Sequence, residues 1–226
     1  DSLSMTQKYK DGSKVVSPGT VIISAIGECS NINQVVSPVL KKKKNAPIIY
    51  INLSQDAYKL GGSSFAQIQN KVGSETPTIQ DSEFFKNGFN AIQKLIKSDI
   101  VEAGHDISAG GLITTLLEMC FADVNLGADI DLTCLNEQDI VKVLFAENAG
   151  VILQVNDIAK ADAILGEMNI AYHTLGTTVD ASELNITSNE LNFNLSVSDL
   201  RDVWYKTSYL LDRKQSGEEK ALERFN

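Results

Sequence analysis

Residues 104–122 constrain the fold most, because they join a paired glycine directly to a long apolar run. The segment reads Gly-His-Asp-Ile-Ser-Ala-Gly-Gly-Leu and then continues as Ile-Thr-Thr-Leu-Leu-Glu-Met-Cys-Phe-Ala. The first turn of a helix has unpaired N–H groups and a partial positive charge, so it favours an anion. Glycines at this point let a ligand approach the backbone closely. The segment thus places the side chains of His105, Asp106 and Ser108 and the backbone of Gly110 and Gly111 at the start of a helix, as candidates for an anion site.

The same pattern also fits a tight turn without a ligand. In that interpretation Asp106 or Ser108 accepts the free N–H groups as a helix cap, and the glycines only permit the bend. The sequence leaves both interpretations open.

A second loop of similar design follows an apolar segment at 46–53 that is typical of a buried strand. After it comes Leu-Gly-Gly-Ser-Ser at 60–64, and the spacing of apolar residues beyond predicts a helix over 63–72, capped by Ser63 or Ser64. Backbone N–H groups and hydroxyls in such a loop suit a phosphate, although the lysine and spacing of a P-loop are missing. The candidate phosphate-binding residues are Gly61, Gly62, Ser63 and Ser64.

Composition narrows the class of protein. The chain has 226 residues, of which 43% are hydrophobic and 22% charged, as in ordinary soluble globular proteins. Its formal net charge of −9 argues against nucleic acid as a partner, and the lysines at 41–44 are interpreted as a solvated connector. Neither a bilayer-spanning run nor a secretion signal is present, so we expect no membrane partner.

Cysteines and histidines are few and scattered. Cys29, Cys120 and Cys134 are odd in number and lack zinc spacing, which favours a reducing cytoplasm. With His105 and His173 as the only histidines, we expect no histidine-rich site and assign no metal ligand.

Strands and helices alternate along the chain. Strand-like segments are expected at 21–26, 46–53, 128–132, 150–155, 170–178 and 191–197. Helices are expected at 63–72, 82–97, 136–146, 157–168 and 198–213, and from the His105 loop to about residue 122. Asp81 is expected to cap the helix at 82–97, which carries Phe85, Phe89, Ile92 and Ile96 on one side, and Asp157 to cap the helix that follows it. This order predicts an α+β fold, an α/β sandwich in which a mixed sheet packs against helices. Three parts are expected: 1–44 as the remnant of a preceding domain plus a connector, 45–213 as the main domain, and 214–226 as a charged tail or linker.

Six segments, in order, resemble phosphoribosylformylglycinamidine synthase of the large, single-chain type. They are Asp-Ser-Leu-Ser-Met at 1–5, Ser-Pro-Gly-Thr-Val-Ile-Ile-Ser-Ala at 17–25, the glycine loop at 60–64, His-Asp-Ile-Ser-Ala-Gly-Gly-Leu at 105–112, 144–155, and the tryptophan-bearing helix at 200–208. Residues 1–44 then resemble the end of an ATP-binding-type domain. The main domain resembles the C-terminal domain of aminoimidazole ribonucleotide synthetase.

The resemblance implies a glutamine-dependent ligase of de novo purine biosynthesis. Such an enzyme converts formylglycinamide ribonucleotide, ATP and glutamine to formylglycinamidine ribonucleotide, with Mg²⁺. ATP activates the amide oxygen as an iminophosphate, and ammonia from glutamine displaces the phosphate. The resemblance places ATP, Mg²⁺ and the glutaminase on other domains of the same chain, so this part is expected to be inactive alone and to carry no catalytic residue.

We take the role of a site residue from the resemblance only at positions where this sequence matches the family's motif. The resemblance places Gly61, Gly62 and Ser63 against the ribose phosphate of the substrate, with Ser64 as a neighbouring hydroxyl. The five residues of the His105 loop either line the cleft or hold the loop that shapes it. Two departures stand out: residue 109 is Ala where many relatives carry Asp, and Glu-Asn at 147–148 keeps only part of an acidic pair. We assign this pair no chemistry.

Two alternatives remain. The chain can belong to a relative in the same superfamily, of the aminoimidazole ribonucleotide synthetase, selenophosphate synthetase or hydrogenase maturation type. It can also be a non-catalytic module for interdomain packing, which an exposed apolar patch at 21–26 or 198–213 would favour.

Overall fold

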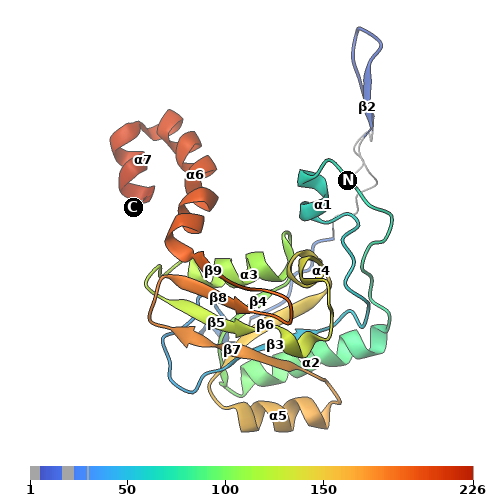
Figure 1. Ribbon diagram of the computed structural model, residues 1–226, viewed down its shortest axis with the longest axis vertical. Helices are drawn as coiled ribbons and strands as arrows, with labels where there is room; N and C mark the ends of the chain where they lie inside the picture. The colour runs from blue at the N-terminus through green and yellow to red at the C-terminus, as the bar shows by residue number, and fades with distance from the viewer. Residues whose placement is uncertain (1–5, 17–22, 30, 226) are drawn as a thin grey trace. The chain divides into compact units, whose positions relative to one another are not determined.

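The computed structural model describes residues 6–16, 23–29 and 31–225 (Figure 1). The chain divides into two compact units, Asp1–Asn33 and Gln34–Asn226. In the first unit, β1 (Thr6–Lys8) pairs antiparallel with β2 (Lys14–Val16). The family-like segment at 1–5, and residues 17–22 of the one at 17–25, lie outside the described residues. Of the strand expected at 21–26, the described residues 23–26 form no strand.

The second unit is built on a seven-stranded sheet in the order β4-β6-β3-β7-β5-β8-β9. Its strands are β3 (Ile48–Asn52), β4 (Val101–Asp106), β5 (Gly127–Asp131), β6 (Gly150–Val155), β7 (His173–Val179), β8 (Glu183–Thr187) and β9 (Asn192–Ser196). Neighbouring strands run antiparallel except β5 and β8, which are parallel. The predicted mixed sheet is therefore confirmed.

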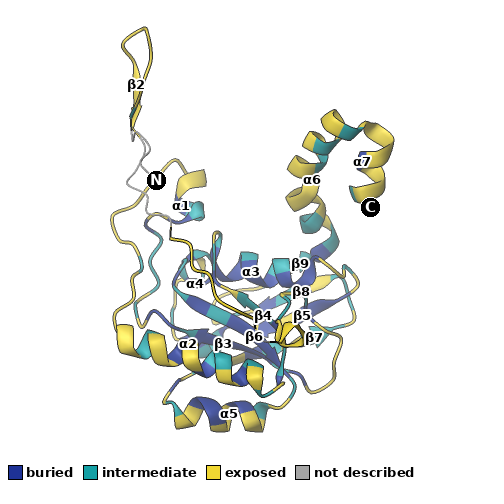
Figure 2. Ribbon diagram, turned by 180° about the vertical axis from the view of Figure 1, so that it is seen from behind, coloured by how far each residue is buried: buried dark blue, intermediate teal, exposed yellow. Residues whose placement is uncertain are grey.

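Helices cover both faces of this sheet (Figures 1 and 2). The helices that the structure describes are α1 (Ser64–Ile68), α2 (Ser82–Lys97), α3 (Gly111–Cys120), α4 (Ile140–Phe145), α5 (Ile158–Glu167), α6 (Val197–Ser216) and α7 (Glu218–Phe225), with short 3-10 turns at Ile32–Gln34 and Thr133–Leu135. Of these, α3 and α4 pack on one face of the sheet and α2 and α5 on the other. Within the described ranges, no helix combines the length and apolar character needed to cross a bilayer.

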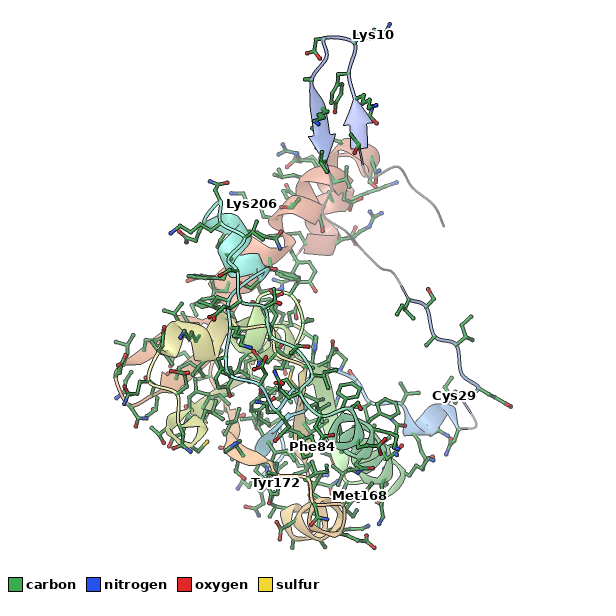
Figure 3. The ribbon with its side chains drawn as sticks, turned by 90° about the vertical axis from the view of Figure 1, so that its right-hand side faces the viewer. Lys10, Cys29, Phe84, Met168, Tyr172 and Lys206 are labelled. Atoms are coloured by element: carbon green, nitrogen blue, oxygen red, sulfur yellow. The ribbon has the colours of Figure 1, made fainter. Side chains whose placement is uncertain are left out.

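Side chains of the central strand β3 divide the core into two clusters. Ile48 and Tyr50 pack with residues of α3 and α4, while Ile49 and Ile51 pack with residues of α2 and α5. This alternation is the period of two expected of a strand, and its burial on both faces explains why 46–53 is apolar throughout. Figure 3 shows Phe84, Met168 and Tyr172, which pack against the second cluster.

Three predicted helix caps are confirmed. Asp81 accepts from Glu83 N and Phe84 N at the start of α2, Asp157 caps α5, and Ser63 accepts from Ala66 N at the start of α1. Short polar side chains at these positions satisfy the free N–H groups of the first turn.

The buried face of α2 agrees with the predicted one only in part. Of the predicted apolar side, Phe85 and Ile92 pack against the second cluster, whereas Phe89 is exposed. The buried residues of the helix are Gly88, Ala91 and Leu95. A Cβ on Gly88 would lie 2.3 Å from Leu53 Cδ2, so the helix approaches the sheet over its small residues.

Two predicted helices are shorter than expected. The helix expected over 63–72 ends at Ile68, because the chain turns through positive φ at Asn70 and leaves Val72 exposed. The helix expected from residue 136 begins at Ile140, with Asp139 as its cap, since Asn136 adopts a left-handed conformation.

Several elements of the structure were not predicted. They include strands β1 and β2, strand β4 at 101–106 and strand β8 at 183–187, and the segment expected as a charged tail or linker contains α7. Gly217 separates α6 from α7 at φ 88°, and Arg224 Nη1 donates to Asp212 Oδ1 at 2.7 Å across the two helices. The domain boundaries at 44 and 213 stay a prediction.

Candidate glycine-loop site

His105 and Asp106 lie on strand β4 rather than in the loop before α3. His105 Nε2 lies 3.3 Å from Glu118 Oε2 on α3, and His105 Nδ1 lies 3.4 Å from Asp106 Oδ1. Burial raises the pKa of Glu118, and the nearby His105 partly offsets this effect. The histidine therefore links the edge strand to α3, while the Asp106 side chain is 80% exposed.

The helix that follows begins without a side-chain cap. Its N-cap is Gly110, at φ 91°, and neither Asp106 nor Ser108 caps it through a side chain, so the cap expected in the turn interpretation is wrong. Ser108 contributes its carbonyl, which accepts from Gly111 N at 3.0 Å. Gly111 has φ 73°, and a Cβ there would lie 2.7 Å from Leu144 O. Both glycines are required by backbone conformation, and Gly111 also by close packing.

The N–H groups of the second loop are occupied by acceptors within the chain. Gly61 N donates to Glu75 O at 2.8 Å, Gly62 N to Val72 O at 2.6 Å and Ser63 N to Leu60 O at 3.2 Å. The returning segment thus lies against the loop, and a Cβ on Gly61 would be 2.3 Å from Glu75 O. The fourth N–H, that of Ser64, donates to a carboxylate.

That carboxylate joins the two glycine loops. Glu147 Oε1 accepts from Ser64 N and from Gly110 N, each at 2.8 Å. A negative charge at the start of α3 is favourable because of the helix dipole. The structure therefore brings the two loops together around an internal anion. Sequence reasoning gave Glu147 no role, although its place in the acidic pair of the resemblance was a signal.

The second residue of the pair, Asn148, holds the chain that leads into the loop. It is 1% exposed, and its Nδ2 donates to Ser54 Oγ at 3.0 Å, Asp56 O at 3.3 Å and Ala57 O at 3.1 Å. These three acceptors fix the orientation of the amide. Asn148 Oδ1 is buried and has no hydrogen-bond donor among the described residues.

Two cavities border the loops. One, of about 490 Å³, is lined by Gly61 and Gly73 and by the side chains Tyr58, Phe65, Lys59, Lys71, Lys142 and Glu75. The other, of about 310 Å³, is mainly apolar and lies between Ser64, Gly110, Phe145 and Trp204. Phe65, which borders both, stacks on Phe145 with ring centroids 4.7 Å apart. The loops are thus accessible from these cavities even though their amides are paired.

Metal ligands and nucleophiles do not gather in the part of the chain that the structure describes. Across those residues, no three His, Cys, Asp or Glu side chains converge in a way that could hold a metal. Burial raises the pKa of Cys120 to about 12, and it also raises the pKa of Cys134. Neither thiol is therefore activated as a nucleophile.

Known proteins similar to this chain point to one family. Residues 47–189 match the family described as "AIR synthase related protein, C-terminal domain". The chain is 34% identical over 220 residues to the Arabidopsis thaliana protein named probable phosphoribosylformylglycinamidine synthase, chloroplastic/mitochondrial, covering 95% of this chain and 15% of that protein. It is 34% identical to the human phosphoribosylformylglycinamidine synthase, covering 96% of this chain and 16% of the relative.

Solved structures agree on the fold. A structure of Thermotoga maritima PurL with FGAR superposes with a TM-score of 0.58 at 18% identity, covering 75% of this chain and 30% of that one. A structure of the same protein with ATP gives a TM-score of 0.56 at 16% identity, with 75% and 28% covered. The family resemblance seen in the sequence is confirmed, and the chain spans 15–16% of the length of the plant and human relatives. The chain belongs to the family of AIR synthase related proteins, whose C-terminal domain it contains.

Proposed function

We propose that this chain is part of a phosphoribosylformylglycinamidine synthase. The proposed parent enzyme converts formylglycinamide ribonucleotide, ATP and glutamine to formylglycinamidine ribonucleotide in the cytoplasm. The observation that carries this proposal is 34% identity across 95% of the chain to a relative of that name. The family model matches residues 47–189, which include both glycine loops.

We propose that the role of this chain within the enzyme is to contact the substrate. In the proposal, Gly61, Gly62, Ser63 and Ser64 form the wall against which the substrate phosphate rests. Its support is the 490 Å³ cavity beside Gly61. Because the loop amides already have acceptors, a phosphate reaching Ser64 N would have to take the place of Glu147.

His105, Asp106, Ser108, Gly110 and Gly111 are proposed to shape this cleft. Gly110 contacts Glu147 directly, and His105 ties strand β4 to α3 through Glu118. No proton transfer is assigned to them.

ATP, Mg²⁺ and the glutaminase are assigned to other domains of the parent protein. The described residues offer no group of ligands that fits a metal ion, so we derive no step through Mg²⁺ in this part. When bound elsewhere, ATP would supply the phosphoryl group that activates the substrate amide.

The test is an assay of the longer protein that carries this chain. Formation of formylglycinamidine ribonucleotide from its three substrates supports the proposal, and activity only on another substrate of the superfamily contradicts it. Ser64→Ala should raise KM for formylglycinamide ribonucleotide. It should leave the midpoint of thermal unfolding unchanged, because the Ser64 hydroxyl makes no hydrogen bond to another described residue. Gly166→Ala, on open surface of α5, is the matched control.

A second candidate function is interdomain packing. The apolar side chains of Val203, Trp204 and Leu211 on α6 are 68%, 52% and 58% exposed, and Figure 2 shows most of α6 and α7 exposed. Exposed apolar patches of this kind are typical of interfaces. If packing is the main role, the isolated chain should self-associate in light scattering, and Trp204→Lys should restore a monomer. A monomeric wild-type chain that binds the substrate tightly would contradict this candidate.

A further inference from the structure

Both nitrogens of the His105 ring face hydrogen-bond acceptors. Nδ1 lies 2.8 Å from the backbone oxygen of Asp106 and 3.4 Å from Asp106 Oδ1, and Nε2 lies 3.3 Å from Glu118 Oε2. A backbone carbonyl can only accept, so the contact at 2.8 Å requires a proton on Nδ1. A neutral imidazole has a single N–H, which leaves Nε2 as a lone pair that faces a carboxyl oxygen. The arrangement is complete only with a second proton between Nε2 and Glu118.

Two carboxyl groups are the charged groups that face His105 in the described part of the chain. Helix α3 contributes Glu118, and β4 itself contributes Asp106. Strand β6 places Ile152 opposite His105, and the segment before β3 contacts the neighbouring Gly104 through uncharged side chain and backbone. Among the described residues, no lysine or arginine lies within ion-pair distance of Glu118. His105 is therefore the group that shares a proton with Glu118.

The pair lies where it can control the loop between β4 and α3. The side chains of His105 and Glu118 are 19% and 20% exposed, so water does not readily replace a lost contact. Burial also raises the pKa of Glu118, which favours a proton at this place. Thr115 Oγ1 donates to the same Asp106 oxygen at 3.2 Å, so strand and helix are joined on both sides of residues 107–110.

We propose that His105 and Glu118 share one proton, and that this proton fixes the loop at 107–110. When the pair loses it, Nε2 and the carboxylate become two acceptors 3.3 Å apart, and an attractive contact becomes a repulsive one. His105 and Glu118 are positioning residues in this proposal, because they act on the cleft through the loop.

The shared proton makes the stability of the fold decrease as the pH rises. An unfolded histidine loses its proton at about pH 6.5, whereas the folded pair holds the proton between two groups. The stabilisation is thus fully present below about pH 6.5 and is lost as the pH rises and the folded pair gives up its proton.

NMR of the ring nitrogens tests the proton directly, because the chain has only two histidines. His173 lies on β7, which β6 and β3 separate from β4, so His173→Gln leaves the signals of His105 alone. We expect Nδ1 of His105 to stay protonated when the pH is raised and the ring becomes neutral. A neutral His105 ring with its proton on Nε2 would overturn the proposal.

Glu118→Gln tests the effect on stability, since its amide can donate to Nε2 without titrating. Between pH 6 and 9, the urea midpoint of the wild type should fall by about 0.3–0.5 M more than that of Glu118→Gln, as for one charge-assisted contact. His173→Gln is the matched control and should keep the wild-type pH dependence. Equal pH dependence in the wild type and a folded Glu118→Gln variant would overturn the proposal, and the NMR measurement does not need this variant.

The link to the substrate rests on the proposed function, whereas the shared proton does not. In the longer protein, KM for formylglycinamide ribonucleotide should rise between pH 6 and 9 by a larger factor in the wild type than in Glu118→Gln. Parallel KM profiles together with the expected NMR result overturn the link to the cleft and support the shared proton. A longer protein that does not use this substrate overturns the proposed function, while the ring-nitrogen measurement still decides the proton.

Discussion

Ser64 and Gly110, which lie far apart in the sequence, donate their backbone N–H groups to the same oxygen, Glu147 Oε1, at 2.8 Å each. Two helix starts that sequence reasoning treated as candidate anion sites therefore share one internal carboxylate. This bridge fixes the two loops against each other. It also sets the condition for ligand binding, because an anion can reach these two amides only by replacing Glu147.

Replacing Glu147 should destabilise the fold in a way that depends on the acceptor. Glu147→Ala leaves two N–H groups without their partner and should lower the free energy of unfolding by about 2 kcal/mol. Glu147→Gln keeps an oxygen acceptor and should cost less than about 1 kcal/mol. Urea unfolding measures both, with Glu190→Ala in the exposed β8–β9 turn as control. Equal losses for Ala and Gln would show that the two hydrogen bonds contribute little.

Gly111→Ala should be costly for two reasons. Its φ of 73° is unfavourable for alanine, and the added Cβ would lie 2.7 Å from Leu144 O. We expect a loss of at least about 2 kcal/mol in thermal or urea unfolding. Gly217→Ala is the comparison without crowding: Gly217 has φ 88° and ψ 162°, a conformation that essentially only glycine adopts, and an added Cβ would meet no atom within 4 Å, so only backbone strain of about 1–3 kcal/mol applies. A similar loss in both variants would mean that crowding at Gly111 is relieved by small shifts.

Asn148→Asp should destabilise the fold most at neutral pH. The carboxylate would face the carbonyl oxygens of Asp56 and Ala57, which now accept from the Asn148 amide. A buried charge without a donor should cost about 3 kcal/mol or more. The loss should shrink as the pH is lowered, since a protonated Asp can donate one hydrogen bond. Asn87→Asp, on the exposed face of α2, should show little change, and a pH-independent loss at Asn148 would contradict this account.

Asp56 should make stability sensitive to acid. Hydrogen bonding to Lys59 is the main cause that lowers the pKa of Asp56 to about 2, helped by the N–H groups of Thr78 and Ala57. The folded pKa lies below the usual value of about 3.9, so the stabilisation is present above pH 4 and is lost as the pH falls toward 2.

Asp56→Asn removes this titrating group. Its urea midpoint should therefore fall less steeply between pH 5 and 2 than that of the wild type, as measured by fluorescence of Trp204. Glu190→Gln serves as control and should keep the wild-type slope. Parallel curves for Asp56→Asn and the wild type would contradict the prediction.

Local signals in the sequence predicted much of the fold. The apolar run at 46–53 and the caps Asp81 and Asp157 identified a buried strand and two helices that the structure contains. These features depend on neighbouring residues, because alternation and capping act over a few positions. The missed strand β8 lies between β5 and β9, so its pairing depends on partners elsewhere in the chain.

For the candidate site, too, some features could be predicted from the sequence and others could not. The sequence by itself determined that two paired glycines precede helices and which family the motifs resemble, because turns and motifs are encoded by adjacent residues. Only the tertiary structure decided that Glu147 joins the two loops, that Val72 and Glu75 occupy the amides of Gly62 and Gly61, and that lysines from three segments meet in one cavity. These are contacts between residues distant in the chain. They exist only after the sheet and its helices have brought those segments together.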